Sequence, residues 1–182
     1  TQLPLGGSQY MKMWYDEQKR RPCAEFVPID NVLLPFSAGS FYTAQRVTEI
    51  QDITTQEFER RMNIGLYRDV DFIRATMEPD ESKAQKANNK IEGKKSEDNV
   101  DGERRVFHIY LDLELEDDAR SDGELAPYIL MIDEMNSEVV GLYRNWEEGD
   151  DTMTKLDWLV EFKFIPWRGA YAIGFPHLIG GL

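Results

Sequence analysis

The stretch that decides the fold is "RVFHIYLDLELE", residues 105–116, in which apolar side chains recur at every second position. A period of two is typical of a β-strand, because successive side chains point to opposite faces of a sheet. One predicted face carries Phe107, Ile109, Leu111, Leu113 and Leu115, and the other carries Val106, His108, Tyr110, Asp112 and Glu114. We expect the first face to cover the core and the acidic face to be passive and solvated.

Two further stretches downstream continue this pattern. "PYILMIDEMNSEVVGLYRNW", residues 127–146, predicts a hairpin that reverses near residues 134–137. "LDWLVEFKFIP", residues 156–166, predicts a strand with Trp158, Val160, Phe162 and Phe164 on its inner face. Short polar links join these four runs, so the sequence predicts an antiparallel meander.

The upstream half predicts a second hairpin, a strand and a helix. "SQYMKMWYD" (8–16) and "PCAEFVPID" (22–30) form the hairpin, and Pro22 and Pro28 favour an edge position because proline cannot donate to a ladder. Residues 42–53 predict a strand. Thr54 followed by Glu57 is a capping-box pattern that begins a helix at about 54–65, with Gly65 as its stop. The fold class is therefore α+β, mainly antiparallel sheet, in a single domain spanning 1–182.

Composition limits the classes of function. The chain has 182 residues, 41% hydrophobic content and a formal net charge of −13. Phosphate contacts come mainly from Lys and Arg, so this charge argues against a general nucleic-acid-binding surface, and it argues equally against adhesion to anionic lipid. The lone cysteine, Cys23, suits a reducing compartment and is expected to be a buried, inert thiol.

Residues 76–103 are polar and carry Lys83, Lys86, Lys90 and Lys94 at helical spacing. We interpret this segment as a solvated insertion, partly helical or disordered; a basic stripe for an acidic partner is the alternative.

The candidates for chemistry are weak. Asp112 and Glu114 would lie about 7 Å apart on one strand face, within the range of paired carboxylates in glycosidases. His108 and His177 lack metal-ligand spacing, although "DDARSDGE" (117–124) could hold calcium weakly. Four tryptophans, Trp14, Trp146, Trp158 and Trp167, could form a carbohydrate platform but are more often core or interface anchors. We therefore predict no catalytic, cofactor-binding or metal residue and no enzymatic activity.

Two ordered sets of residues resemble a known family. "RRPCAEFVPIDNVLLP" followed by a strand, a capped helix and "GLYRDVD" resembles portal proteins of short-tailed bacteriophages and related prophages. "PYILMIDEMNSEVVGLYRNWEEGD" and "LVEFKFIPWRGAYAIGFPHLIGGL" resemble that family more closely. The resemblance covers most of 20–75 and nearly all of 105–182, and the sequence departs from the pattern at Trp167, Arg168 and Pro176.

This resemblance implies a structural role without catalysis. Portal subunits form a dodecameric ring at one capsid vertex, with terminase, tail adaptor and capsid proteins as partners and DNA only as passing cargo. The expected location is the virion, after synthesis in the cytoplasm of the bacterial host, with no membrane association. Residues 168–182 would begin a truncated helical segment of a wing-like domain. The glycines of this region give the backbone little intrinsic order, so we expect residues 166–182 to be poorly anchored. The alternative is a carbohydrate-binding or accessory β-domain of a hydrolase.

Overall fold

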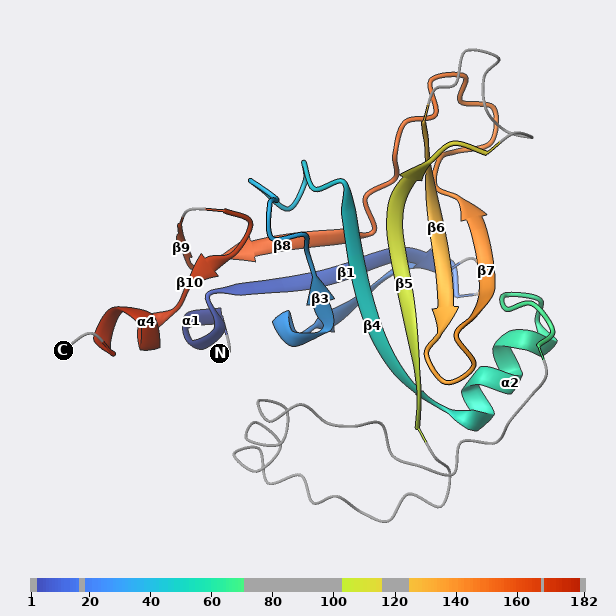
Figure 1. The fold of residues 1–182 in the computed structure, drawn as a ribbon, viewed down its shortest axis with the longest axis horizontal. Coiled ribbons are helices and arrows are strands. Elements are labelled where there is room, and N and C mark those ends of the chain that lie inside the picture. The colour runs from blue at the N-terminus through green and yellow to red at the C-terminus, as the bar shows by residue number, and fades with distance from the viewer. Residues whose placement is uncertain (1–2, 17–18, 71–102, 116–124, 168, 181–182) are drawn as a thin grey trace. The chain divides into compact units, whose positions relative to one another are not determined.

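The computed structural model describes residues 3–16, 19–70, 103–115, 125–167 and 169–180, and its elements are drawn in Figure 1. One sheet has the strand order β2 (Arg21–Val27), β1 (Ser8–Asp16), β8 (Leu159–Lys163). A five-stranded sheet has the order β3 (Val32–Leu33), β4 (Arg46–Thr54), β5 (Glu103–Leu113), β6 (Ala126–Asp133), β7 (Glu138–Arg144). The pair β9 (Ile165–Pro166) and β10 (Ala172–Ile173) completes the strands of the described residues. The helices are α1 (Leu3–Gly6), the 3-10 turn η1 (Ile29–Asn31), α2 (Thr55–Asn63) and α4 (Phe175–Ile179).

The predicted fold class is confirmed: mainly antiparallel sheet with short helices. Strands β1 and β2 pair antiparallel from Tyr10 opposite Val27 to Asp16 opposite Arg21. β2 lies at the edge of its sheet, the position that its Pro22 favours. The β6–β7 hairpin turns at residues 134–137, where Ser137 adopts a positive φ of 55°.

The helix α2 begins and ends where the sequence predicts. The Thr54 hydroxyl accepts a hydrogen bond from the Glu57 amide at 3.2 Å, so one orphan donor of the first turn is satisfied. Gly65 has a φ of +76° just past the end of the helix, a conformation that side chains with a Cβ rarely adopt.

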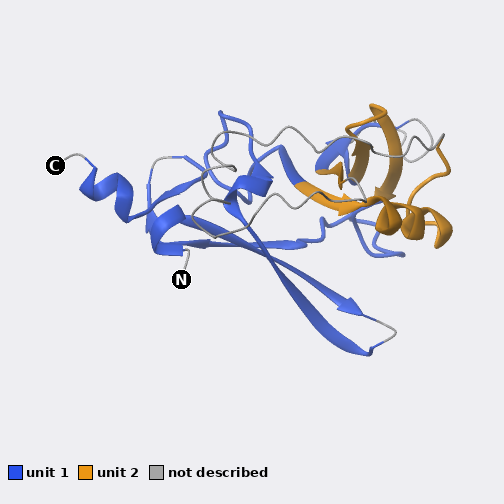
Figure 2. Ribbon diagram, turned by 90° about the horizontal axis from the view of Figure 1, so that it is seen from below, with its two compact units in different colours: residues 1–49, 110–128, 144–182 blue, residues 50–109, 129–143 orange. Residues whose placement is uncertain are grey.

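The prediction of a four-strand meander is wrong for its last strand, β8. β8 pairs with β1, from Ser8 opposite Lys163 to Lys12 opposite Leu159, and therefore joins the N-terminal hairpin. The chain divides into two compact units: residues 1–49, 110–128 and 144–182 form unit 1, and residues 50–109 and 129–143 form unit 2 (Figure 2).

The predicted inner and outer faces of two strands are also wrong. In β5 the alternating buried positions are Arg104, Val106, His108 and Tyr110, while the opposite side chains are half-buried. In β8 the side chain of Glu161 is 3% exposed, whereas Phe162 is 45% exposed. Polar side chains occupy the buried face because most of them find partners there.

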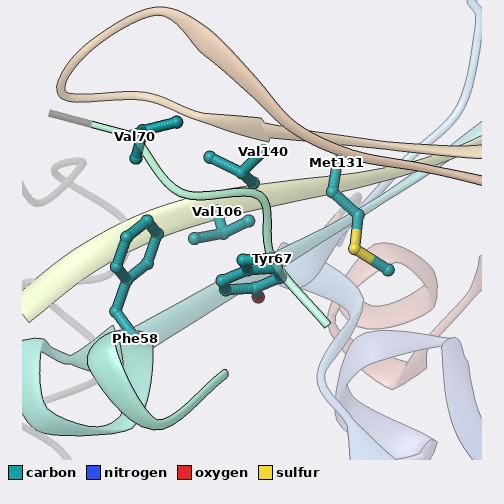
Figure 3. Close-up of a cluster of buried hydrophobic side chains, with 6 residues drawn as sticks. All are labelled: Phe58, Tyr67, Val70, Val106, Met131 and Val140. Atoms are coloured by element: carbon teal, nitrogen blue, oxygen red, sulfur yellow. The ribbon is translucent and has the colours of Figure 1, made fainter. Parts of the chain in front are cut away.

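The hydrophobic core of unit 2 gathers around α2 and β5. Its buried members are Phe58, Tyr67, Val70, Val106, Met131 and Val140. Figure 3 shows the Tyr67 ring lying between Phe58 and Met131, and the centroids of the Phe58 and Tyr67 rings are 5.1 Å apart. Burying such apolar side chains contributes about 1.5–3 kcal/mol each, so this cluster stabilises unit 2.

Residues 172–175, at the start of the C-terminal segment, contact other parts of unit 1, whereas the side chains of α4 are exposed. The Ala172 amide donates to the Ser8 hydroxyl at 2.8 Å, and the Phe164 and Phe175 rings lie 4.9 Å apart. A Cβ on Gly174 would lie 2.3 Å from the Leu5 carbonyl oxygen, so the backbone of α1 approaches this residue too closely for any side chain. Pro176 occupies the first turn of α4, where its missing N–H leaves no acceptor unsatisfied. Among the helices that the structure describes, none has the length and apolar character needed to cross a membrane.

Candidate functional site

The acidic pair expected on β5 remains on the surface. Asp112 and Glu114 are both exposed, on the last residues of the strand and just beyond it. Nothing within the described residues encloses the pair in a cleft, as a glycosidase requires. The calcium candidate at 117–124 and the lysine stripe at 83–94 lie outside the described residues.

The two histidines occupy different units and different environments. His108 is buried in unit 2, where its Nε2 lies 3.2 Å from the Tyr67 hydroxyl. His177 is exposed on α4 in unit 1. Across the described part of the chain, no group of three His, Cys, Asp or Glu side chains is arranged to hold a metal ion.

The tryptophans do not share one surface role. Trp158 donates its indole N–H to the Asn145 side chain at 2.7 Å, and Trp146 stacks edge-on against Tyr128. These two residues are anchors of unit 1, the role that tryptophans have more often than carbohydrate binding. Trp167, at 63% exposure, presents its ring to solvent. Cys23 is half-buried on β2 opposite Trp14, so the expected burial of its thiol is wrong.

The buried polar groups of unit 1 converge on Glu49. Its Oε2 accepts from Lys12 Nζ at 2.8 Å and from the Tyr110 hydroxyl at 3.0 Å. Burial raises the pKa of Tyr110 well above its usual value, and the Glu49 carboxylate adds to this shift. A small cleft beside Tyr110 is lined mainly by apolar side chains such as Phe41, Val47 and Leu159. This arrangement ties β1, β4 and β5 together and is structural.

Unit 2 contains a buried ion pair and a hydrogen-bonded chain. Arg104 and Asp133 pair with both side chains fully buried, and the Arg104 guanidinium lies 4.2 Å from the centroid of the Phe58 ring. Arg61 donates to the Tyr67 hydroxyl at 2.7 Å and to Glu57 Oε1 at 2.8 Å. Hydrogen bonds from Arg60 and then Arg61 lower the pKa of Glu57 to about 2.

A second buried carboxyl in unit 1 is less well satisfied. Glu161 Oε1 and the Tyr10 hydroxyl, which face each other across β8 and β1, are buried and find no hydrogen-bond partner among the described residues. Lys163 Nζ lies 3.4 Å from the other carboxylate oxygen of Glu161. Burial raises the pKa of both Glu161 and Tyr10, and the Glu161 carboxylate raises that of Tyr10 further.

A further candidate surface is the face of the β2-β1-β8 sheet that carries Met13. Directly opposed residues of antiparallel strands share a face, so the register places these side chains together: Met11, Met13, Tyr15, Pro22, Ala24, Phe26, Val160 and Phe162. Met13, Tyr15 and Phe26 are 47%, 61% and 48% exposed. We call this set the apolar sheet face. The inner–outer assignment made from the sequence missed it, because it took Val160 and Phe162 as core.

Three basic residues, Lys19, Arg20 and Arg21, follow one another where this hairpin turns, and all three are exposed. Lys19 Nζ lies 3.1 Å from the Asp16 carboxylate, so the basic tip consists of Arg20 and Arg21. The run "KRR" can be read from the sequence, but only the strand register places it at the end of an apolar hairpin.

An acidic loop lies elsewhere in unit 1, at residues 147–157. It carries five carboxylates, Glu147, Glu148, Asp150, Asp151 and Asp157, against one lysine. The Asp150 carboxylate accepts from the Thr152 hydroxyl and from the amides of Thr154 and Thr152, which lowers its pKa to about 2 and fixes the loop. Glu147, Glu148, Asp151 and Asp157 are exposed.

The sequence was compared with models of protein families and with curated proteins. No family model matches the chain, and no curated protein matches it either.

Proposed function

We propose that this chain is a wing-like domain of a bacteriophage portal subunit, a non-catalytic part of the ring through which DNA is packaged and ejected. The observation that carries the proposal is the resemblance of two long segments to that family, in the right order along the chain. Residues 127–150 span the β6–β7 hairpin, and residues 159–182 run from β8 into α4.

The electrostatics of the chain support a structural role beside DNA. The net charge of −13 disfavours contact with phosphates, which suits a surface that a polyanion passes without adhering. The buried polar groups also support it, because Glu49, Arg104 and Asp133 are committed to internal pairs that hold strands together.

The test is assembly. The open reading frame that contains this sequence, with whatever follows Leu182, is expressed and imaged by negative-stain electron microscopy. Twelve-fold rings that bind terminase in a pull-down are expected, while residues 1–182 alone should associate only weakly and without ring closure. A full reading frame that stays monomeric would contradict the proposal.

The exposed Trp167 favours the alternative of a carbohydrate-binding domain enough to require a control. Aromatic side chains presented flat to solvent are suited to stack on sugar rings, and a glycan array tests this directly. Binding that is lost in Trp167→Ala would support the alternative. Absence of binding, together with rings, supports the portal.

A further inference from the structure

The β1–β2 hairpin extends beyond the strand that supports it. β8 pairs with β1 from Ser8 to Lys12, and the Met13 amide donates to the Trp158 carbonyl at 2.8 Å. Beyond that point, residues 13–16 and 21–24 pair with each other alone among the described strands. We call these residues the arm; Figure 2 shows it running away from the other strands of unit 1.

The base of the arm is fixed, while its far half lacks support. Lys12 is held by its 2.8 Å ion pair with Glu49, whose side chain is 4% exposed. An isolated two-stranded hairpin is marginally stable in water, and this one presents half of the Met13 side chain and more of Tyr15 to solvent. The arm therefore has the character of a surface that a partner covers.

The charge of the arm selects the kind of partner. Arg20 and Arg21 form a basic tip on a chain of net charge −13, so the tip is complementary to the body of another copy. Within unit 1 that body carries the acidic loop 147–157. A nucleic acid fits less well, because the exposed flank of the arm is apolar and the chain as a whole repels polyanions.

We propose that the arm of one copy docks on unit 1 of a second copy of this chain, with its basic tip against the acidic loop 147–157 and Met13 and Tyr15 buried beside it. Two arms do not pair tip to tip, because that would bring Arg20 and Arg21 of both copies together. The contact is therefore between two different surfaces, and such contacts propagate into rings or open chains. This inference adds a specific contact to the proposed ring. The contact itself does not depend on the proposed function, but the closure of such contacts into a ring rests on it.

The test exchanges the charges of the two surfaces. Self-association of the 182-residue chain is measured by sedimentation over a concentration series at low salt. Arg20→Glu with Arg21→Glu, or Glu147→Lys with Glu148→Lys, should weaken it by about tenfold or more, because attraction becomes repulsion. Mixing the two variants should restore association between them.

The control variant is Arg46→Glu with Arg68→Glu, which makes the same change of net charge at two exposed positions outside the arm. It should associate like the parent chain, and circular dichroism should show all variants folded. Equal loss in the control, or no rescue on mixing, would mean that net charge alone governs association and would overturn the proposal. A parent chain that is monomeric at every concentration would overturn it too.

A thiol cross-link separates the two geometries. Cys23 lies in the arm, so a short bismaleimide should join Cys23 to Glu148→Cys of another copy and give a ladder of multimers. Dimers formed through Cys23 alone would show tip-to-tip pairing and refute the docking. Rings that still form after the Arg20/Arg21 reversal would support the portal proposal and contradict the arm contact. Arm-dependent association without rings in the full reading frame would support the arm contact and contradict the portal proposal. DNA binding lost in the same reversal would assign the tip to nucleic acid instead.

Discussion

Glu161 buries one carboxylate oxygen, Oε1, that accepts no hydrogen bond from the described residues, and Tyr10, whose hydroxyl is buried in the same state, lies opposite it on β1. The raised pKa of Glu161 means that the folded protein holds the proton more tightly than the unfolded chain. Stability is then highest when both states are protonated, and it falls as the pH rises from the unfolded value toward the folded one.

We predict that Glu161→Gln stabilises the protein at pH 7 by about 1 kcal/mol, because an under-satisfied buried carboxylate is removed. The gain should shrink as the pH falls below the unfolded pKa of 4.5 and vanish at about pH 3, where the carboxyl is neutral in both states. Urea denaturation at the two pH values measures it, with the exposed Glu148→Gln as control. A variant less stable than the parent at pH 7 would show that the Lys163 pair outweighs desolvation.

Arg104 and its neighbour Arg105 offer a matched comparison on one strand. Arg104 pairs with Asp133 in full burial, whereas Arg105 pairs with Asp52 at 2.8 Å with both side chains partly exposed. We predict that Arg104→Met costs about 3–5 kcal/mol of unfolding free energy, because it leaves the buried Asp133 charge uncompensated.

Arg105→Met should cost no more than about 1 kcal/mol, as expected for a partly exposed pair. Chemical denaturation of both variants measures the difference. Equal costs would mean that the faces of β5 are not divided as the structure has them. Arg104→Met combined with Asp133→Leu should recover much of the loss, since no unpaired charge remains.

At the scale of elements, α2 depends on its first turn. Thr54→Ala removes the acceptor for the Glu57 amide and should cost about 1 kcal/mol, while Thr54→Ser, which keeps the hydroxyl, should cost little. Thermal denaturation followed by circular dichroism distinguishes the two. If both substitutions cost the same, packing of the threonine methyl rather than capping would be responsible.

The same turn makes unit 2 sensitive to acid. Glu57 has its pKa lowered from 4.5 to about 2 by Arg60 and Arg61. Its contribution is fully present above pH 4.5 and is lost as the pH falls toward 2, with a size reduced to about 1 kcal/mol by solvent screening. Glu57→Gln should flatten this part of the stability profile. An unchanged profile would place the acid sensitivity in other carboxyls.

The elements were predictable from the sequence to the extent that their causes are local. The cap at Thr54, the stop at Gly65 and the alternation in β5 and β6 all act within a few residues. The burial of Arg104 and Glu161 was not predictable, because it depends on residues far along the chain: Asp133 pairs with Arg104, and Tyr10 lies opposite Glu161 in the sheet. The pairing of β8 with β1 is equally non-local, and the apolar sheet face was missed for that reason.

At the scale of the whole molecule, charge governs what the chain attracts. We predict no appreciable binding of the 182-residue chain to duplex DNA at physiological salt, because −13 opposes a polyanion. Fluorescence anisotropy with a labelled duplex measures this. Micromolar, salt-sensitive affinity would overturn the prediction, and deletion of 83–95 would then show whether the lysine stripe causes it.

The ion pair between Arg104 and Asp133 also bears on how the chain avoids misfolding. A β-strand that slips by one residue exchanges its two faces, and hydrophobic contacts alone would tolerate such a slip in β5 because both faces contain apolar side chains. Because Arg104 is the buried residue, a slipped pairing would separate its guanidinium from the Asp133 carboxylate and leave a charge unpaired. The pair therefore favours a single register between the strands. Its removal should appear first as heterogeneous refolding and faster amide exchange in β5 and β6, before any loss of sheet content.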